Sequence, residues 1–77
     1  MDAIQFMNFC NSTQSSGYVK HWKSVGILYV VEDIMKRDYT RQDIFDYVLN
    51  CLAMEGFTIS ACETITDYLI ENMKETA

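Results

Sequence analysis

The chain has 77 residues, of which 49% are apolar and 22% charged, and its net charge is −5. This composition is typical of a single small globular domain and excludes a disordered chain. A domain of this size buries only about 60% of its unfolded surface, so its core is marginal unless another chain completes it. Three cysteines without CxxC spacing and a single histidine, His21, predict neither a disulfide framework nor a metal site, and we expect no cofactor.

Two segments bear on where the protein works. The N-terminus MDAIQFMNFC lacks the basic region that opens a secretory signal. The apolar run VGILYVV, at residues 25–31, is far shorter than the roughly 20 residues that cross a bilayer. We therefore expect a cytoplasmic protein, in the host cytoplasm if it is viral, without a membrane partner.

The chain contains no proline and only three glycines, which favours helices over strands joined by tight turns. We predict a first helix over residues 2–10, with Asp2 as its N-cap. The small and polar residues NSTQSSG, at 11–17, predict a loop between this helix and a helical core at 18–75.

The second predicted helix, at residues 18–37, is apolar on nearly every side. At about 100° per residue, its apolar side chains fall into three sectors. One sector comprises Tyr18, Trp22, Val25 and Tyr29, a second comprises Ile27, Val30, Val31 and Ile34, and a third comprises Leu28 and Met35. The polar side of the first two turns is assigned to Lys20, His21, Lys23 and Ser24. A strand at 25–31 is the alternative, but no other segment alternates with a period of two.

A helix that is apolar all round must be buried all round. The other helices could cover it, but a homodimer does so more easily, and we predict self-association through this helix. The residues predicted to make that contact are Val25, Leu28, Tyr29, Val31 and Met35. Tyr18 and Trp22 share a helical face and are expected to form an anchor, either in the core or in an interface.

Two further helices are predicted at 41–55 and 61–75. The first opens on the capping-box pattern TRQD, residues 40–43, and ends at Gly56. Its inner face is expected to carry Ile44, Phe45, Val48, Leu49 and Leu52. The second opens on the capping box SACE, residues 60–63. Its inner face is expected to carry Cys62, Ile65, Tyr68, Leu69 and Met73.

These elements predict an all-α fold, a single domain at residues 1–77 built as a small, dimeric bundle of about four helices. No catalytic residues are predicted, because the chain has one histidine and no Gly-rich phosphate loop, GxSxG or P-loop pattern. We therefore expect a non-enzymatic module that binds another protein and modulates or inhibits it.

Charge suggests where such a partner binds. Residues 1–31 have a net charge of +1, whereas residues 32–77 have a net charge of −6. In the last predicted helix four acids recur at every fourth position, stacked about 6 Å apart along one side. They are Glu63, Asp67, Glu71 and Glu75. We expect the first three of them, together with Trp22, to contact the partner.

Two other functions remain as alternatives. The spacing of the acids is close to that of phosphates, so the protein could act as an acidic decoy in a nucleic-acid-binding groove, a strategy of small phage inhibitors such as anti-CRISPR proteins. The segment from Leu52 to Met73 also has the outline of a helix-turn-helix DNA-binding regulator. Direct nucleic-acid binding is disfavoured, because affinity for phosphate comes mainly from Lys and Arg and the last helix offers only Lys74.

Overall fold

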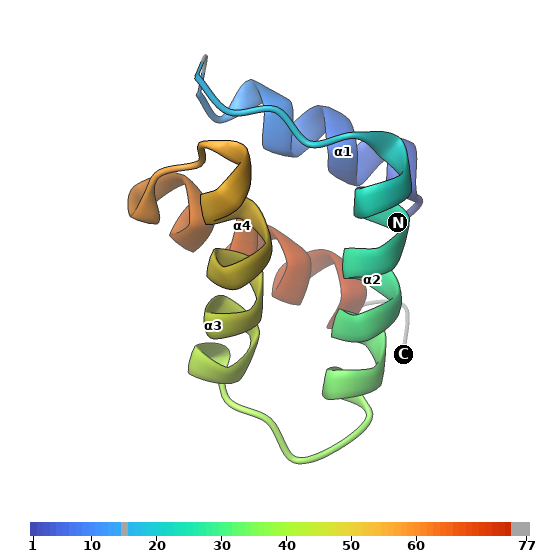
Figure 1. The fold of residues 1–77 in the computed structure, drawn as a ribbon. Coiled ribbons are helices and arrows are strands. Elements are labelled where there is room, and N and C mark those ends of the chain that lie inside the picture. The colour runs from blue at the N-terminus through green and yellow to red at the C-terminus, as the bar shows by residue number, and fades with distance from the viewer. Residues whose placement is uncertain (15, 75–77) are drawn as a thin grey trace.

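A computed structural model describes residues 1–14 and 16–74 of the chain. The predicted all-α fold is confirmed, because all regular secondary structure in these residues is helical (Figure 1). The elements, in chain order, are α1 (Ala3–Ser12), α2 (His21–Met35), α3 (Arg41–Leu52), a 3-10 turn η1 (Ala53–Glu55) and α4 (Ile59–Lys74). Glu75, the predicted last residue of the fourth helix, lies outside the described residues. No described helix is both long and apolar enough to cross a membrane.

The helices pack into a compact body. The Cα radius of gyration is 11.2 Å, close to the roughly 11.5 Å expected of a globular chain of this length. α3 packs mainly on α4, α1 packs mainly on α2, and α2 also contacts α3. In Figure 1, α1 crosses the upper ends of α2 and α3, and α4 lies behind them. α2 therefore has neighbours on one side, which we call its inner side, and turns its outer side to solvent.

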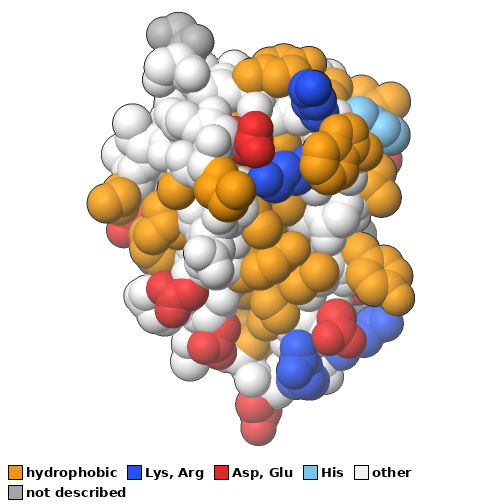
Figure 2. Space-filling model, in the orientation of Figure 1, with side chains coloured by type: hydrophobic (Ala, Val, Ile, Leu, Met, Phe, Trp, Pro, Cys, Tyr) orange, Lys and Arg blue, Asp and Glu red, His pale blue; other side chains and the backbone are white. Residues whose placement is uncertain are grey.

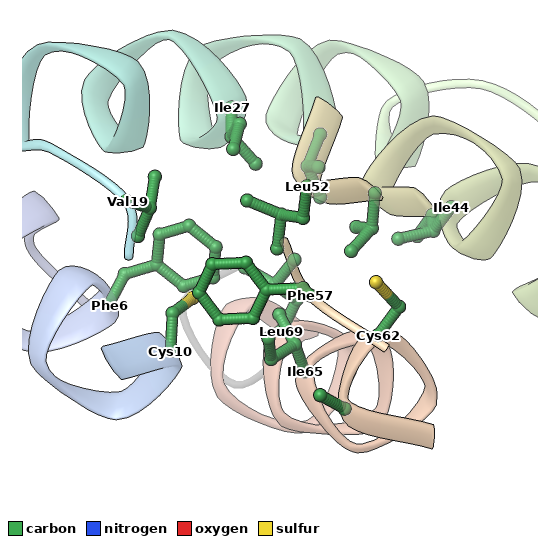
Figure 3. Close-up of a cluster of buried hydrophobic side chains, with 13 residues drawn as sticks. Phe6, Cys10, Val19, Ile27, Ile44, Leu52, Phe57, Cys62, Ile65 and Leu69 are labelled. Atoms are coloured by element: carbon green, nitrogen blue, oxygen red, sulfur yellow. The ribbon is translucent and has the colours of Figure 1, made fainter. Parts of the chain in front are cut away.

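The core lies where the four α-helices meet (Figure 3). Its fully or nearly fully buried side chains include Phe6 and Cys10 of α1, Ile27 and Val31 of α2, Ile44, Val48 and Leu52 of α3, and Cys62, Ile65 and Leu69 of α4. Phe45, Leu49, Tyr68 and Met73 pack half-buried against them, so the predicted inner faces of α3 and α4 are confirmed. Burying one such aliphatic side chain contributes about 1.5–3 kcal/mol.

Two predicted N-caps are confirmed. The Asp2 carboxylate accepts a hydrogen bond from the Gln5 N–H at 2.8 Å, and the Gln5 side-chain oxygen accepts one from the Asp2 N–H at 3.2 Å. Thr40 and Asp43 form the same reciprocal pair at the start of α3, with distances of 3.3 and 2.8 Å. Each pair satisfies two backbone donors that the first turn of a helix leaves open.

The predicted cap of α4 is wrong. The helix begins at Ile59, two residues earlier than expected, because Thr58 rather than Ser60 caps it. The Thr58 hydroxyl accepts a hydrogen bond from the Ala61 N–H at 3.1 Å. The Thr58 N–H in turn donates to the side chain of Gln14 at 2.9 Å, a contact between segments far apart in sequence.

α2 is shorter than predicted at both ends, running from His21 to Met35. Residues 18–20 are not helical, because the Asn11 side chain holds the backbone of Val19. The Asn11 amide donates to the Val19 carbonyl at 3.1 Å, and its oxygen accepts from the Val19 N–H at 2.8 Å. The Val19 side chain is fully buried, so the approach to α2 is anchored in the core.

The helical segment that begins with α3 ends at Gly56, as predicted, but its last three residues, 53–55, form the 3-10 turn η1. The φ of Gly56, +90°, lies in the left-handed region that favours glycine. The next residue, Phe57, donates its N–H to the Leu52 carbonyl at 3.1 Å and buries its ring in the core. This turn holds α3 and α4 together as a packed pair.

Candidate functional site

The outer side of α2 exposes large apolar side chains. Trp22 is 71% exposed, Tyr29 is 78% exposed and Val25 is 47% exposed, and Tyr18, just before the helix, is 58% exposed. Figure 2 shows hydrophobic side chains gathered over α2, toward the right of the view. We call Tyr18, Trp22, Val25, Gly26 and Tyr29 the α2 surface. Of the two roles predicted for Tyr18 and Trp22, their exposure excludes the core.

Gly26 lies beside Trp22 and Tyr29 on the α2 surface. At about 100° per residue, it falls within about 60° of both Trp22 and Tyr29 around the helix. A Cβ built on Gly26 meets no heavy atom within 4 Å beyond its chain neighbours and the adjacent backbone of α2, whereas one built on Gly17 would lie 2.8 Å from the ring of Phe57. Glycine inside a helix costs about 1 kcal/mol relative to alanine. No contact within the described residues requires a glycine at this position.

The structure divides the five residues predicted for self-association. Val25 and Tyr29 are exposed, and Leu28 and Met35 are half-buried against the core. Val31 is fully buried within the chain's own core, so it is not part of the α2 surface and cannot contact a second chain there. The cause is the orientation of α2, whose aliphatic stripe faces inward and whose aromatic stripe faces outward.

The predicted polar side of the first turns of α2 also needs correction. Ser24 is fully buried, and its hydroxyl donates to the Lys20 carbonyl at 3.0 Å. A serine that bonds its own helix in this way can pack inside without an unsatisfied donor. Lys23 is half-buried and reaches Glu55 of η1.

Ion pairs border the α2 surface. They join Lys23 to Glu55 at 2.9 Å, Glu32 to Lys36 at 3.4 Å and Asp33 to Arg37 at 3.0 Å. Each acid and each lysine within α2 therefore has an opposite charge within 4 Å. The α2 surface is therefore mainly apolar, and the charged side chains at its border form ion pairs within the chain.

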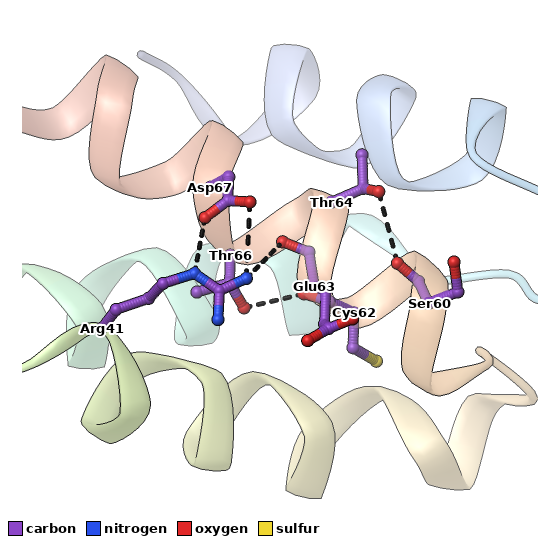
Figure 4. A network of polar contacts seen from close by, with 7 residues as sticks. All are labelled: Arg41, Ser60, Cys62, Glu63, Thr64, Thr66 and Asp67. Atoms are coloured by element: carbon purple, nitrogen blue, oxygen red, sulfur yellow. Dashed lines mark hydrogen bonds and ion pairs between the residues drawn. The ribbon is translucent and has the colours of Figure 1, made fainter.

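The row of acids on α4 is interrupted by a base from α3 (Figure 4). The Arg41 guanidinium donates to the two carboxylate oxygens of Asp67 at 2.7 and 3.3 Å, and to the Glu63 carbonyl at 3.4 Å. The hydrogen bond lowers the pKa of Asp67 and raises that of Arg41. Glu63 and Glu71 are exposed, and Glu75 lies outside the described residues. Of the predicted contact residues on α4, Glu63 and Glu71 therefore form no ion pair within 4 Å with another described residue, although the charge of Glu63 also acts on Arg41.

The buried thiols are unsuited to nucleophilic chemistry. Burial, with a smaller effect of the neighbouring Cys62, raises the pKa of Cys10 to about 12, and burial raises the pKa of Cys62. A reactive cysteine needs a lowered pKa and access to solvent. His21 is exposed at the start of α2. In the part of the chain that the structure describes, no three His, Cys, Asp or Glu side chains gather as metal ligands.

An open depression lies at the turn between α2 and α3. It is lined by Ile34, Arg37, Asp38 and Asp43. Two of its charged groups are already engaged, Arg37 with Asp33 and Asp43 with the Thr40 N–H. The depression therefore offers few uncommitted polar groups to a ligand.

Comparisons with protein-family models, with curated proteins and with solved structures found no match. Function is therefore inferred from the α2 surface itself. Gly26 is the member of this surface that the sequence did not mark as functional. A glycine inside an otherwise apolar helical stripe is the signal that could have revealed it.

Proposed function

We propose that the protein is a non-enzymatic module that binds another protein through the α2 surface and thereby modulates that partner. The observation that supports this function is the clustering of Trp22, Val25 and Tyr29 on the outer side of one helix. Large exposed apolar patches on soluble proteins are commonly interaction sites. Tryptophan and tyrosine are also the residues most enriched at the energetic centres of protein interfaces.

The charges near α2 favour a protein over a nucleic acid. Aromatic rings beside bases can bind single strands by stacking and charge. Here, however, Lys23 is held by Glu55, and Lys36 and Arg37 are held by acids of α2. Of the lysines and the arginine at residues 18–37, Lys20 alone has no ion pair with another described residue. One such base is a weak electrostatic footprint for a phosphate backbone.

The acidic decoy has less support than the α2 surface. Asp67 is paired with Arg41, so a decoy would rely on the carboxylates of Glu63 and Glu71. These two residues lie about 12 Å apart along α4 at 1.5 Å per residue. The same acidic side of α4 would repel DNA if α3 and α4 acted as a helix-turn-helix. Changing Glu63, Asp67 and Glu71 to Gln together is expected to leave partner binding intact. Loss of binding in that triple variant would favour the decoy.

Site-specific photo-crosslinking tests the proposed function. A photoreactive phenylalanine analogue replaces Trp22 in one variant and Asn50, exposed on α3, in a matched control. In cells that make the protein, we expect protein adducts from position 22 and few from position 50. Adducts with nucleic acid at position 22, or equal adducts at both positions, would contradict a protein-binding role for α2.

A further inference from the structure

We propose that the protein bound at the α2 surface is a second copy of this chain, in an antiparallel, two-fold symmetric pair. In this pair, Tyr29 of each copy fills the gap above Gly26 of the other. The proposal rests on the proposed function, because it names the occupant of the same surface.

The steric argument begins at Gly26. Apart from its chain neighbours and the adjacent backbone of α2, no atom lies within 4 Å of the place where its Cβ would be, so a second helix can approach the backbone closely there. Tyr29 lies almost one turn further along, is highly exposed and makes no hydrogen bond or ring contact with another described residue. A two-fold axis midway between these residues brings each Tyr29 opposite the other copy's Gly26. The symmetry therefore places the ring of Tyr29 against the bare backbone of Gly26 at two equivalent points.

The same axis pairs two other residues of α2. It sets Trp22 opposite Asp33, and these two residues lie within about 20° of each other around the helix at about 100° per residue. The indole N–H of Trp22 has no acceptor among the described residues, and the Asp33 carboxylate, although paired with Arg37, retains acceptor sites. One symmetry operation therefore pairs a ring with a glycine and a hydrogen-bond donor with an acceptor. It places no two like charges directly opposite each other.

The distribution of charge favours a second copy over an acidic partner. Residues 18–37 hold four bases and two acids, for a net +2, and the rest of the chain holds two bases and nine acids, for a net −7. Two such chains repel each other if their acidic parts meet. Contact through α2 keeps those parts apart. Lys23, Lys36 and Arg37 beside the α2 surface are already paired within the chain, so they do not require acids from another protein.

The size of α2 indicates how tightly the two copies are expected to bind each other. Its 15 residues span about 22 Å, and one pair of helices buries less than the roughly 800 Å² per partner of a standard interface. We therefore expect a dissociation constant in the micromolar range and a dimer that forms as concentration rises.

Light scattering after size exclusion, between about 1 μM and about 1 mM, brackets such an affinity and tests the proposal. The wild type is expected to rise from 9.0 kDa toward twice that mass. Tyr29→Ser, which removes the inserted ring, is expected to stay monomeric. Gly26→Ala, which fills the gap, is expected to raise the dissociation constant by about tenfold or more, equivalent to about 1.4 kcal/mol.

Met54→Ser is the matched control, because Met54 is 81% exposed on η1, outside the α2 surface. It is expected to dimerise like the wild type. The proposal is overturned if the wild type remains at 9.0 kDa throughout, if Gly26→Ala leaves the dissociation constant unchanged, or if Met54→Ser weakens association as strongly as Tyr29→Ser.

A crosslinker at position 29 separates this proposal from the proposed function. An adduct of twice the chain's mass, formed by the purified protein and in cells, supports the second copy. An adduct with a different protein only overturns the second copy and leaves the protein-binding role in place. Absence of any protein adduct overturns both.

Discussion

The two sides of α2 are both apolar, yet they have different surroundings. On the inner side, Ile27 and Val31 are buried among the other helices, whereas on the outer side Trp22 and Tyr29 face solvent. The buried inner side chains are aliphatic except for Ser24, whose hydroxyl donates to a backbone carbonyl. The outer ones are rings with an N–H or O–H at the tip, which water can solvate in the monomer and a partner can bind. The comparison separates folding from association: the inner side stabilises the monomer, and the outer side is available to a second chain.

The largest expected effect is on the inner side. Ile27→Ala is expected to lower the free energy of unfolding by about 2–5 kcal/mol, because it leaves a cavity among packed side chains. Val25→Ala, on the outer side of the same helix, is expected to change it by about 0.5 kcal/mol or less. Urea unfolding at concentrations where the protein is monomeric measures both. Equal losses in the two variants would show that α2 has no distinct outer side.

Alkaline pH probes the core that the inner side helps to form. The Cys10 thiol has its pKa raised from 9.0 to about 12, so the folded chain keeps a proton that the unfolded chain loses above pH 9. The free energy of unfolding should therefore fall by about 1.4 kcal/mol per pH unit from this thiol between pH 9 and pH 11. Cys10→Ala should remove that part of the slope in urea unfolding. Parallel curves for the two proteins would contradict the burial of this thiol.

Gly26→Ala is expected to move stability and association in opposite directions. In the monomer it should raise the free energy of unfolding by up to about 1 kcal/mol, because alanine favours the helix and its Cβ meets no atom within 4 Å. The same methyl group should weaken the dimer. Urea unfolding at low concentration, compared with the dissociation constant, shows both effects. A less stable monomer would mean that the chain's own fold needs this glycine.

The smallest expected effect lies away from α2, at Asp67. The pKa of this carboxyl is lowered, mainly by the hydrogen bond from Arg41, so its contribution is present above the ordinary pKa and lost as pH falls through the lowered value. Asp67→Asn should therefore be slightly less stable than the wild type at pH 7 and approach its stability as pH falls through the lowered pKa. The dissociation constant of the dimer should be the same for Asp67→Asn and for the wild type. A weaker dimer would place Asp67 in or beside the interface.

Local patterns predicted much of the fold. The i, i+4 repeats of α3 and α4 identified the buried Ile44, Val48 and Ile65, because each of these helices has one clearly apolar side. The capping pairs at Asp2 and Thr40 follow from side chains only three residues apart.

Long-range contacts account for what the sequence could not predict. The orientation of α2 was not accessible, because a helix that is apolar all round has no periodicity to say which side faces inward. The start of α2 depends on Asn11 binding Val19, and the cap of α4, Thr58, is held by Gln14, 44 residues away in the chain. The acidic row is altered by Arg41, which is 26 residues from its partner in the chain.

Trp22 offers the most direct test, because it is the only tryptophan of the chain and lies on the α2 surface. Its emission spectrum therefore reports on that surface alone. On raising the concentration from about 1 μM to about 1 mM, we expect the emission to shift to shorter wavelengths as the indole leaves water, with the same midpoint as the doubling in mass. Gly26→Ala should move that midpoint to higher concentration. An emission spectrum that stays constant while the mass doubles would place the contact elsewhere and contradict the assignment of the outer side of α2 to association.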